Sequence, residues 1–269
     1  MSERLAILAC GGALPVMLAH AHPEALHFTL RGVPSELGET AQEFPLERIG
    51  GLFAAMREAG VKRMVFAGSL TRPALNPAEF DAEMTRLAPR LMAAIPQGDD
   101  ALLRFVISMF EEQGFDVLGA HELLPGLTVE KGLAVGPTPS EAELSDAARA
   151  AHILAEISPL DIGQSCVVAG GQCLGIETVQ GTDALLAYVA QTPDALRRGQ
   201  RGVYVKAPKR GQDLRIDMPT VGPSTVDGVA DAGLAGLVVA ANCVVILDRE
   251  VTLARAEERG IFLISQAIA

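Results

Sequence analysis

Cationic side chains gather in one stretch of this 269-residue chain, from Arg197 to Arg215. Seven lysines and arginines stand there against a single carboxylate, Asp213, so the stretch carries +6 while the whole chain carries −11. Such a concentration of cations in an acidic protein attracts an anionic ligand. A solvated charged loop is the alternative. The interleaving of Lys206, Lys209 and Arg215 with carboxylates and prolines favours a binding site.

Two carboxylates, Asp213 and Asp217, flank Arg215 at the end of this stretch. In an extended segment all three side chains would share one face, with the carboxylates roughly 13 Å apart at about 3.3 Å per residue. One ion cannot bridge that distance, so either the segment bends or the acids have separate roles. One would hold Mg²⁺, which needs few protein carboxylates, and the other would orient water or a cationic side chain.

Glycines follow the first expected strand, in the run Cys10-Gly11-Gly12-Ala13-Leu14-Pro15. At a turn from strand to helix, glycines let backbone N–H groups approach an anion. The run lacks the GxGxxG spacing, and Pro15 stands where the third glycine would allow close helix packing, which disfavours an ordinary dinucleotide site. Two interpretations stay open: a tight structural turn, and a nucleotide-phosphate contact by Gly11 and Gly12.

Polar side chains also stand at the start of two expected helices. Asp99 and Asp100 precede an apolar helix, where one Asp suffices to cap the exposed amides, so the second is a candidate for holding a metal or a water. Thr182 and Asp183 follow Gly181 at another helix start. They would cap that helix or bind a sugar or phosphate.

Composition and missing motifs disfavour several function classes. The net charge of −11 argues against broad binding to nucleic acid. The five histidines are dispersed without HExxH spacing, and neither a GxSxG elbow nor a P-loop occurs, which disfavours zinc hydrolases, acyl transfer and P-loop chemistry. The four cysteines lack CxxC spacing, so we expect reduced thiols in a cytoplasm, with no export signal and no membrane-spanning segment.

The first half of the chain alternates short apolar runs with amphipathic segments, which predicts a parallel sheet flanked by helices. Expected strands are 5–9, 26–30, 63–67 and 115–119, and expected helices are 13–21, 47–59, 78–94 and 99–113. The predicted fold class is therefore α/β, with a Rossmann-like parallel sheet in the N-terminal domain.

A Gly- and Pro-rich stretch interrupts this pattern and predicts a domain boundary. The expected organisation is a first domain 1–131, a linker 132–140 and a second, catalytic domain 141–269. Ser140 and Glu143 form a capping box at the start of a helix. Beyond it, two strands joined by Gly170-Gly171 and later strands interleaved with helices predict an α/β domain with a mixed sheet. The expected strands are 165–169, 172–177, 203–206, 237–240, 244–248 and 261–265.

Several short motifs follow one another along nearly the whole chain. They are Gly11-Gly12 with Pro15, Phe66-Ala67-Gly68 with Arg72-Pro73, Gly98 to Leu103, Asp161 to Ser165, Glu177, Gly181 to Asp183, Lys206 to Lys209, and Gln212 to Pro223. In this combination the sequence resembles the UDP-2,3-diacylglucosamine pyrophosphatases of lipid A biosynthesis, of the type without metallophosphoesterase motifs.

The resemblance implies a cytoplasmic enzyme that hydrolyses UDP-2,3-diacylglucosamine to UMP and 2,3-diacylglucosamine 1-phosphate with Mg²⁺ or Mn²⁺, and a location peripheral to the inner membrane stays open. It implies catalytic roles for Asp217, Asp213 and Arg215, with both acids as metal ligands. Expected substrate-binding residues are Gly11, Gly12, Asp99, Asp100, Gln164, Thr182, Asp183, Lys206, Lys209, Gln212 and Thr220. The implied partner is a lipid-linked nucleotide sugar and not a nucleic acid. Transient contact with the inner-membrane surface and a homodimer stay open.

Two other function classes remain as alternatives. A nucleotide-dependent oxidoreductase built on the first domain would show the absorbance of a bound nicotinamide or flavin. A non-catalytic carrier of a nucleotide-sugar lipid would bind the same molecule without releasing UMP. Cation-dependent UMP release separates the enzyme from the carrier.

Overall fold

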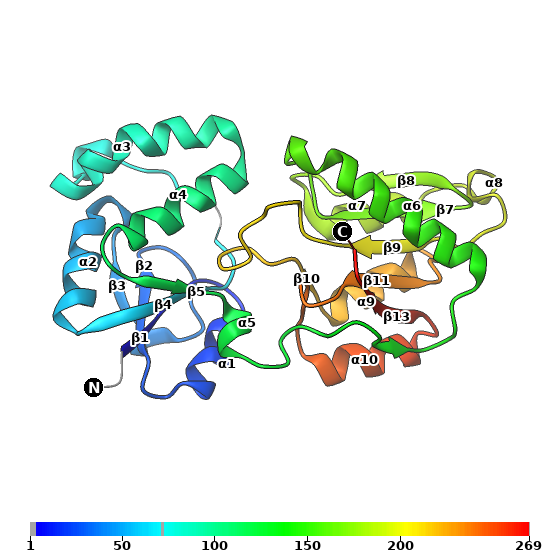
Figure 1. Cartoon of the computed structure of the whole chain (residues 1–269), viewed down its shortest axis with the longest axis horizontal. Coiled ribbons are helices and arrows are strands. Elements are labelled where there is room, and N and C mark those ends of the chain that lie inside the picture. Colours follow the sequence, from blue (N-terminus) through cyan, green and yellow to red (C-terminus); the bar gives the residue numbers. More distant parts are fainter. Residues whose placement is uncertain (1–3, 71–72, 269) are drawn as a thin grey trace. The chain divides into compact units, whose positions relative to one another are not determined.

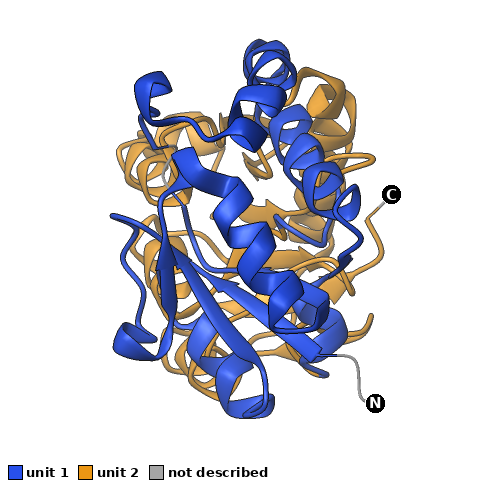
Figure 2. Ribbon diagram, turned by 90° about the vertical axis from the view of Figure 1, so that its left-hand side faces the viewer, with its two compact units in different colours: residues 1–125, 213–217 blue, residues 126–212, 218–269 orange. Residues whose placement is uncertain are grey.

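The computed structural model describes residues 4–70 and 73–268, and the chain forms two compact units (Figures 1 and 2). The first unit comprises Met1–Pro125 with Asp213–Asp217, and the second comprises Gly126–Gln212 with Met218–Ala269. The sequence predicts a continuous second domain, whereas the segment Asp213–Asp217 packs with the first unit. Arg72, one of the motif residues, lies outside the described residues.

The first unit is built on a five-stranded sheet whose strands all run parallel, in the order β3-β2-β1-β4-β5. These strands are β1 (Arg4–Ala9), β2 (Leu26–Leu30), β3 (Gln42–Phe44), β4 (Val61–Ala67) and β5 (Asp116–Leu118). A first strand at the centre, with the chain stepping outward on both sides, is typical of the Rossmann arrangement. The expected Rossmann-like parallel sheet is confirmed. The sequence did not predict β3, because its three residues are too few to show an apolar pattern.

The helices of the first unit are α1 (Leu14–Ala21), α2 (Ile49–Glu58), α3 (Ala82–Ala94), α4 (Asp99–Glu111) and α5 (Ala120–Leu123), with short 3-10 turns at Gly38–Thr40, Leu46–Arg48, Pro77–Glu79 and Ile95–Gln97. Helix α3 begins later than the expected residue 78 because Asp81 caps it, accepting the backbone N–H of Met84 at 2.7 Å. In the core, the rings of Phe53 from α2 and Phe110 from α4 pack edge to face, with centroids 5.0 Å apart.

The second unit contains a six-stranded mixed sheet in the order β6-β13-β11-β9-β7-β8. Its strands are β6 (Ala134–Val135), β7 (Ser165–Ala169), β8 (Gln172–Ile176), β9 (Val203–Lys206), β11 (Gly236–Ala240) and β13 (Phe262–Gln266). Strands β9, β11 and β13 are parallel, while β6, β7 and β8 each run antiparallel to a neighbour. A separate parallel pair joins β10 (Thr220–Val221) to β12 (Val245–Ile246). The predicted mixed sheet is confirmed.

The helices of the second unit are α6 (Glu141–Ile157), α7 (Gly181–Ala190), α8 (Asp194–Arg197), α9 (Pro223–Asp231) and α10 (Arg249–Glu258), with a 3-10 turn at Ser158–Leu160. Helix α6 begins at the predicted capping box: Ser140 Oγ accepts the N–H of Glu143 at 3.3 Å, and Glu143 Oε2 accepts the N–H of Ser140 at 2.7 Å. None of the helices within 4–70 and 73–268 combines the length and the apolar content needed to cross a bilayer.

The hairpin of β7 and β8 turns at the predicted glycine pair. Gly170 and Gly171 have φ angles of +55° and +72°, which glycine adopts without steric cost. The buried carboxylate of Asp146, on α6, accepts both of their backbone N–H groups, at 2.9 and 2.7 Å. Asp146 therefore has a structural role at the turn of the hairpin, whereas Ser165 lies at its open end.

Candidate functional site

The carboxyl ends of β9, β11 and β13 lie at one edge of the second sheet, because these strands are parallel neighbours. In open α/β sheets, ligands bind outside this edge. Lys206 ends β9, and the antiparallel strand β7 begins beside it, since Ser165 pairs with Lys206. Strand β8 ends just before Glu177, and the Ala207 N–H donates to the Gln164 carbonyl at 3.0 Å. This carboxyl edge therefore holds Gln164 and Lys206, two of the predicted substrate residues.

Five polar side chains meet at the carboxyl edge, and we call them the Lys206 cluster: Ser165, Glu177, Thr182, Tyr204 and Lys206. Lys206 Nζ donates to Thr182 Oγ1 at 2.8 Å and lies 3.4 and 3.5 Å from the two Glu177 oxygens. Glu177 also accepts the hydroxyls of Thr182, at 2.7 Å, and Ser165, at 2.6 Å. Since Ser165 donates to Glu177, the Tyr204 hydroxyl, 2.7 Å from Ser165 Oγ, donates to Ser165. The cluster converges on the Glu177 carboxylate.

The Lys206 cluster contains a nearly buried ion pair. The side chains of Lys206 and Glu177 are only 5% and 12% exposed. Burial raises the pKa of Glu177, but the charge of Lys206 and the hydrogen bonds from Ser165, Thr182 and Lys206 outweigh it, so this pKa lies below its ordinary value. Burial raises the pKa of Tyr204, which keeps its hydroxyl a donor.

The loop after β9 carries two more predicted substrate residues, Lys209 and Gln212. The ammonium of Lys209 forms an ion pair with Asp161. Gln212 Oε1 accepts the backbone N–H of Lys209 at 3.0 Å, and the N–H of Arg210 donates to Ser158 Oγ. These bonds fix the loop against the turn that follows α6.

In the first unit, Arg215 is the centre of a charged group. Its Nε and Nη2 donate to the Asp213 carboxylate at 2.9 and 2.7 Å, and its Nη1 donates to Glu111 Oε1, on α4, at 2.7 Å. The bonds from Arg215 lower the pKa of Asp213 and raise that of Arg215 itself. Arg215 therefore ties its own segment to α4.

The segment Asp213–Asp217 is bent. Residues 214–216 form a turn, and Asp213 Oδ1 accepts the backbone N–H of Arg215 at 3.1 Å. Ile216 packs against the apolar core of the first unit. The extended geometry considered from the sequence does not occur, because this local hydrogen bond and Ile216 favour the turn.

The glycine turn after β1 is bridged to the loop after β4. The Gly11 N–H donates to the Ser69 carbonyl at 3.0 Å, and the Ser69 N–H donates to the Gly11 carbonyl at 2.8 Å. Gly68 has φ +94°, and a Cβ there would lie 2.4 Å from the Gly11 carbonyl oxygen. Close backbone contact therefore explains Gly68 structurally, whereas a Cβ at Gly11 would come close only to Ser69 Oγ, at 3.2 Å, and Gly12 is exposed with φ +94°.

The two helix starts with polar side chains have other residues as their N-caps. Gly98, with φ +109°, is the N-cap of α4, and Asp99 and Asp100 lie in its first turn, where Asp100 pairs with Arg104 at 2.7 Å. Helix α7 begins at Gly181, one position before Thr182. Thr182 and Asp183 thus lie within its first turn, where the Thr182 hydroxyl bonds to Glu177 and the Asp183 carboxylate suits the positive end of the helix dipole.

The predicted site residues divide between the two units. In the first unit are Gly11, Gly12, Asp99, Asp100, Asp213, Arg215 and Asp217, and in the second are Gln164, Thr182, Asp183, Lys206, Lys209, Gln212 and Thr220. Thr220, at the start of β10, donates to the Met218 carbonyl at 3.0 Å. The structure joins Thr182 to Lys206 and Asp213 to Arg215 by direct side-chain bonds.

Three members of the Lys206 cluster have no site role predicted from the sequence: Ser165, Glu177 and Tyr204. One signal was present: Tyr204 and Lys206 stand two apart in an otherwise valine strand, so they share a face. Their partners lie far away along the chain and come together only through the strand order of the sheet.

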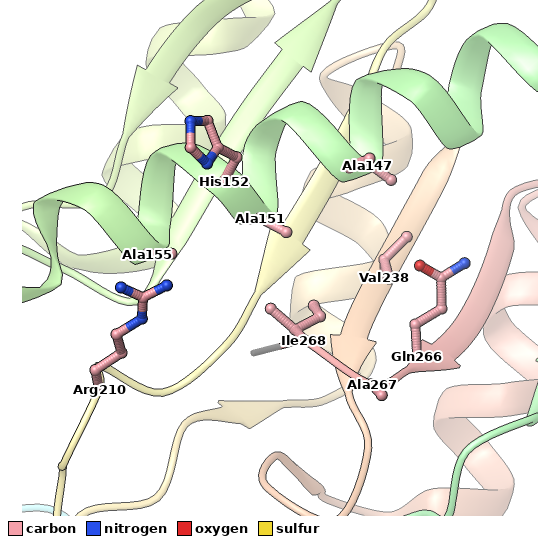
Figure 3. A pocket seen from close by; sticks show the side chains of 10 residues that line it. Ala147, Ala151, His152, Ala155, Arg210, Val238, Gln266, Ala267 and Ile268 are labelled. Carbon is pink, nitrogen blue, oxygen red and sulfur yellow. The ribbon is translucent and has the colours of Figure 1, made fainter.

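A pocket of about 380 Å³ also lies in the second unit (Figure 3). It is lined by Ala147, Ala148, Ala151, His152, Ala155, Arg210, Val238, Gln266, Ala267 and Ile268. Since Val239 pairs with Lys206, its neighbour Val238 points to the other face of the sheet. In Figure 3 the Arg210 side chain extends toward the end of α6 that carries Ala155. The pocket and the Lys206 cluster therefore occupy opposite faces of the second sheet.

Within 4–70 and 73–268, no group of three or more His, Cys, Asp or Glu side chains is placed to hold a metal ion. Both carboxylate oxygens of Asp213 are bonded to the cationic Arg215. Asp213 therefore does not fit the role of metal ligand in this conformation.

Comparison with known proteins identifies the family. The LpxI N-terminal domain matches residues 4–127, and the LpxI C-terminal domain matches residues 130–264. A relative from Caulobacter vibrioides, named UDP-2,3-diacylglucosamine pyrophosphatase LpxI, is 38% identical over 271 residues, which cover 97% of this chain and 97% of the relative. On this similarity, the chain belongs to the LpxI family.

Proposed function

We propose that this chain hydrolyses the diphosphate bond of UDP-2,3-diacylglucosamine, releasing UMP and 2,3-diacylglucosamine 1-phosphate for lipid A biosynthesis. The observation that carries the proposal is the similarity, over 97% of both chains, to a relative named for this activity. Because the similarity covers both units, it supports the complete reaction and not only a shared domain.

In this proposal, cations of the second unit bind the diphosphate. Cleavage of a phosphoanhydride develops negative charge on the departing oxygen, and Lys or Arg side chains stabilise that charge. We assign this role to Lys206 and Lys209, with Gln164, Thr182, Asp183, Gln212 and Thr220 binding other polar groups of the substrate. The position of Lys206 at the carboxyl edge of parallel strands supports the assignment.

The attacking water needs a carboxylate that accepts its proton or orients it. We assign this catalytic role to Asp217, at the end of the bent segment. The bonds of Arg215 to Asp213 and Glu111 favour a supporting role for that pair, which shapes the segment carrying Asp217. Gly11, Gly12, Asp99 and Asp100 remain proposed contacts with substrate.

Metal dependence is also part of the proposal. When bound, Mg²⁺ or Mn²⁺ would neutralise charge on the diphosphate oxygens. Since Asp213 is engaged by Arg215, Asp217 is the carboxylate we assign as its protein ligand. A single protein carboxylate is compatible with Mg²⁺, because water and phosphate oxygens complete its coordination.

The chemistry of the proposed substrate indicates where in the cell the enzyme would meet it. A diacylated sugar nucleotide resides at a membrane surface with its polar end in water, so we propose that the enzyme meets it by transient contact at the cytoplasmic side of the inner membrane. We also propose that the protein resides in the cytoplasm and forms a homodimer. We propose no nucleic-acid partner.

The experiment is incubation of the purified protein with UDP-2,3-diacylglucosamine and chromatographic detection of UMP, with Mg²⁺, with Mn²⁺ and with EDTA. We expect equal amounts of UMP and the sugar phosphate, formed only when a divalent cation is present. Binding without UMP release would identify a carrier and contradict the proposal. UMP release that persists in EDTA would remove the metal from the mechanism.

A further inference from the structure

Glu177 differs from the other buried carboxylate of the second unit in what it binds. Asp146 accepts two backbone N–H groups and holds a turn. Glu177 accepts only side-chain donors in the bonds described, and two of them, Thr182 and Lys206, are proposed to touch substrate. Its contacts therefore orient functional groups and not the backbone.

Stability alone is a weak explanation for the ion pair of Glu177 and Lys206. Removing two charges from water costs free energy that their attraction repays only with excellent geometry, and apolar side chains of similar size often stabilise a core equally well. The pair also lies at the carboxyl edge of the sheet, where α/β proteins bind ligands. A buried charged pair at this edge indicates a functional role.

The geometry of Lys206 leaves it able to bind an anion. An ammonium group has three N–H donors. Thr182 takes one at 2.8 Å, whereas the Glu177 oxygens lie 3.4 and 3.5 Å away, beyond the 2.7–2.9 Å typical of a tight charge-assisted bond. The hydrogen bonds from the ammonium to Glu177 are therefore long, so Glu177 provides the opposite charge while an anion can compete for these N–H donors.

We propose that Glu177 is a positioning residue for the diphosphatase reaction: it keeps the buried Lys206 ammonium charged and, by accepting the Thr182 hydroxyl that in turn accepts from Lys206, orients this ammonium toward a diphosphate oxygen. This inference rests on the proposed function. Glu177 itself does not touch the substrate, and no proton or covalent bond is exchanged with it. Its effect on turnover is transmitted through Lys206 and Thr182.

A charge effect of this kind changes the pH dependence of turnover. The groups facing Lys206 are the Glu177 carboxylate after β8, the Tyr204 phenol on β9, and the hydroxyls of Ser165 and Thr182. Among them only Glu177 carries a negative charge at neutral pH. Burial disfavours a charge that has no counter-ion. When Glu177 is replaced by a neutral residue, the decline of activity at alkaline pH should therefore begin at a lower pH than in the wild-type enzyme.

The test compares kcat, KM and the pH profile of Glu177→Gln and Glu177→Asp with those of the wild type. For Glu177→Gln we expect kcat to fall about 100-fold, the effect of a misplaced reacting group, and KM to change little. The alkaline limb of its pH profile should lie at lower pH. Glu177→Asp keeps the charge and should retain the wild-type alkaline limb. Asp146→Asn, which removes another buried carboxylate, is the matched control and should leave the profile unchanged.

A double-variant cycle shows whether Glu177 acts through Lys206. Adding Glu177→Gln to Lys206→Met should reduce kcat no further than Lys206→Met alone. The double variant buries neither charge without its partner, so it remains informative when the single Glu177→Gln variant folds poorly. Two results would overturn the inference without affecting the proposed function of the wild type. One is a double variant whose loss of kcat equals the product of the two single losses, and the other is a pH profile of Glu177→Gln equal to that of Asp146→Asn. A wild-type protein that releases no UMP would overturn the proposed function and this inference with it.

Discussion

Arg215 and Asp213 are joined by two parallel hydrogen bonds, from Nε to Oδ1 at 2.9 Å and from Nη2 to Oδ2 at 2.7 Å. The same guanidinium reaches Glu111 on α4 at 2.7 Å. A planar guanidinium fits this double arrangement, whereas a Lys ammonium acts as a single point charge. The side chain of Arg215 therefore holds the segment Asp213–Asp217, whose flanking residues belong to the second unit, on the first.

Replacement of Arg215 should destabilise the protein and raise the pKa of Asp213 toward its ordinary value. We expect Arg215→Ala to lower the free energy of unfolding by about 1 kcal/mol, the upper range for a partly exposed ion pair of good geometry. Urea unfolding measures the loss. Arg86→Ala, which removes an exposed pair with Glu83 within α3, is the control and should cost clearly less than Arg215→Ala. Equal losses in the two variants would contradict the anchoring role of Arg215.

Glu177 should contribute stability that depends on pH. Its pKa in the folded protein lies below its ordinary value, because the Lys206 charge and three hydrogen bonds outweigh the effect of burial. The contribution is therefore present above the ordinary Glu pKa of about 4.3 and is lost as the pH falls through the lower folded value. In urea unfolding, the difference between wild type and Glu177→Gln should be largest near neutral pH and shrink in acid. A difference that is constant down to about pH 3 would exclude this linkage.

Cys173 should be the most reactive of the four thiols. It is exposed, lies 3.8 Å from Cys166 Sγ, and its pKa is lowered by a hydrogen bond from the Cys166 thiol. Burial raises the pKa of Cys10 to about 11, which disfavours its thiolate. Mass spectrometry after brief alkylation should find Cys173 modified before the buried Cys10 and Cys166, and Cys166→Ala, which removes the hydrogen-bond donor, should slow the reaction of Cys173. Preferential labelling of Cys10 would contradict the structure.

Gly68 should tolerate substitution much less than Gly60. Both have positive φ angles, +94° and +75°, but an added Cβ meets the Gly11 carbonyl oxygen at 2.4 Å at Gly68 and nothing within 4 Å at Gly60. We expect Gly60→Ala to cost about 1 kcal/mol from the backbone conformation alone. Gly68→Ala should cost about 1–3 kcal/mol more, because backbone atoms must move. Equal costs would show that the bridge between Gly11 and Ser69 yields without strain.

Local sequence signals predicted much of the fold. The alternation around β1, α1, β2 and β4 predicted a parallel sheet, and the capping box of Ser140 and Glu143 placed the start of α6 correctly. The Gly170-Gly171 pair predicted the hairpin turn. These signals succeed because each depends on residues close together in the chain.

The site depended on contacts that no local pattern encodes. Lys206 was expected to clamp the diphosphate, a role that stays a prediction, but its ion pair with Glu177 forms across two strands and was not foreseen. Asp213 was expected to hold a metal, yet its carboxylate is satisfied by Arg215, two residues away, once the segment turns. Thr182 was expected to cap a helix or bind substrate, and its hydroxyl bonds to Glu177. The partner of Lys206 is distant along the chain, whereas the partners of Asp213 and Thr182 are near in sequence and depend on how the chain turns there.

The assignment of catalysis to Asp217 is tested most directly by single-turnover release of UMP from UDP-2,3-diacylglucosamine by Asp217→Asn, an isosteric change that removes the charge and replaces one acceptor oxygen by an NH2 group. We predict a rate about 100- to 10,000-fold below that of the wild type, the range for loss of a positioned acid–base group, with substrate binding and melting temperature retained. Turnover at the wild-type rate by the folded variant would contradict the account.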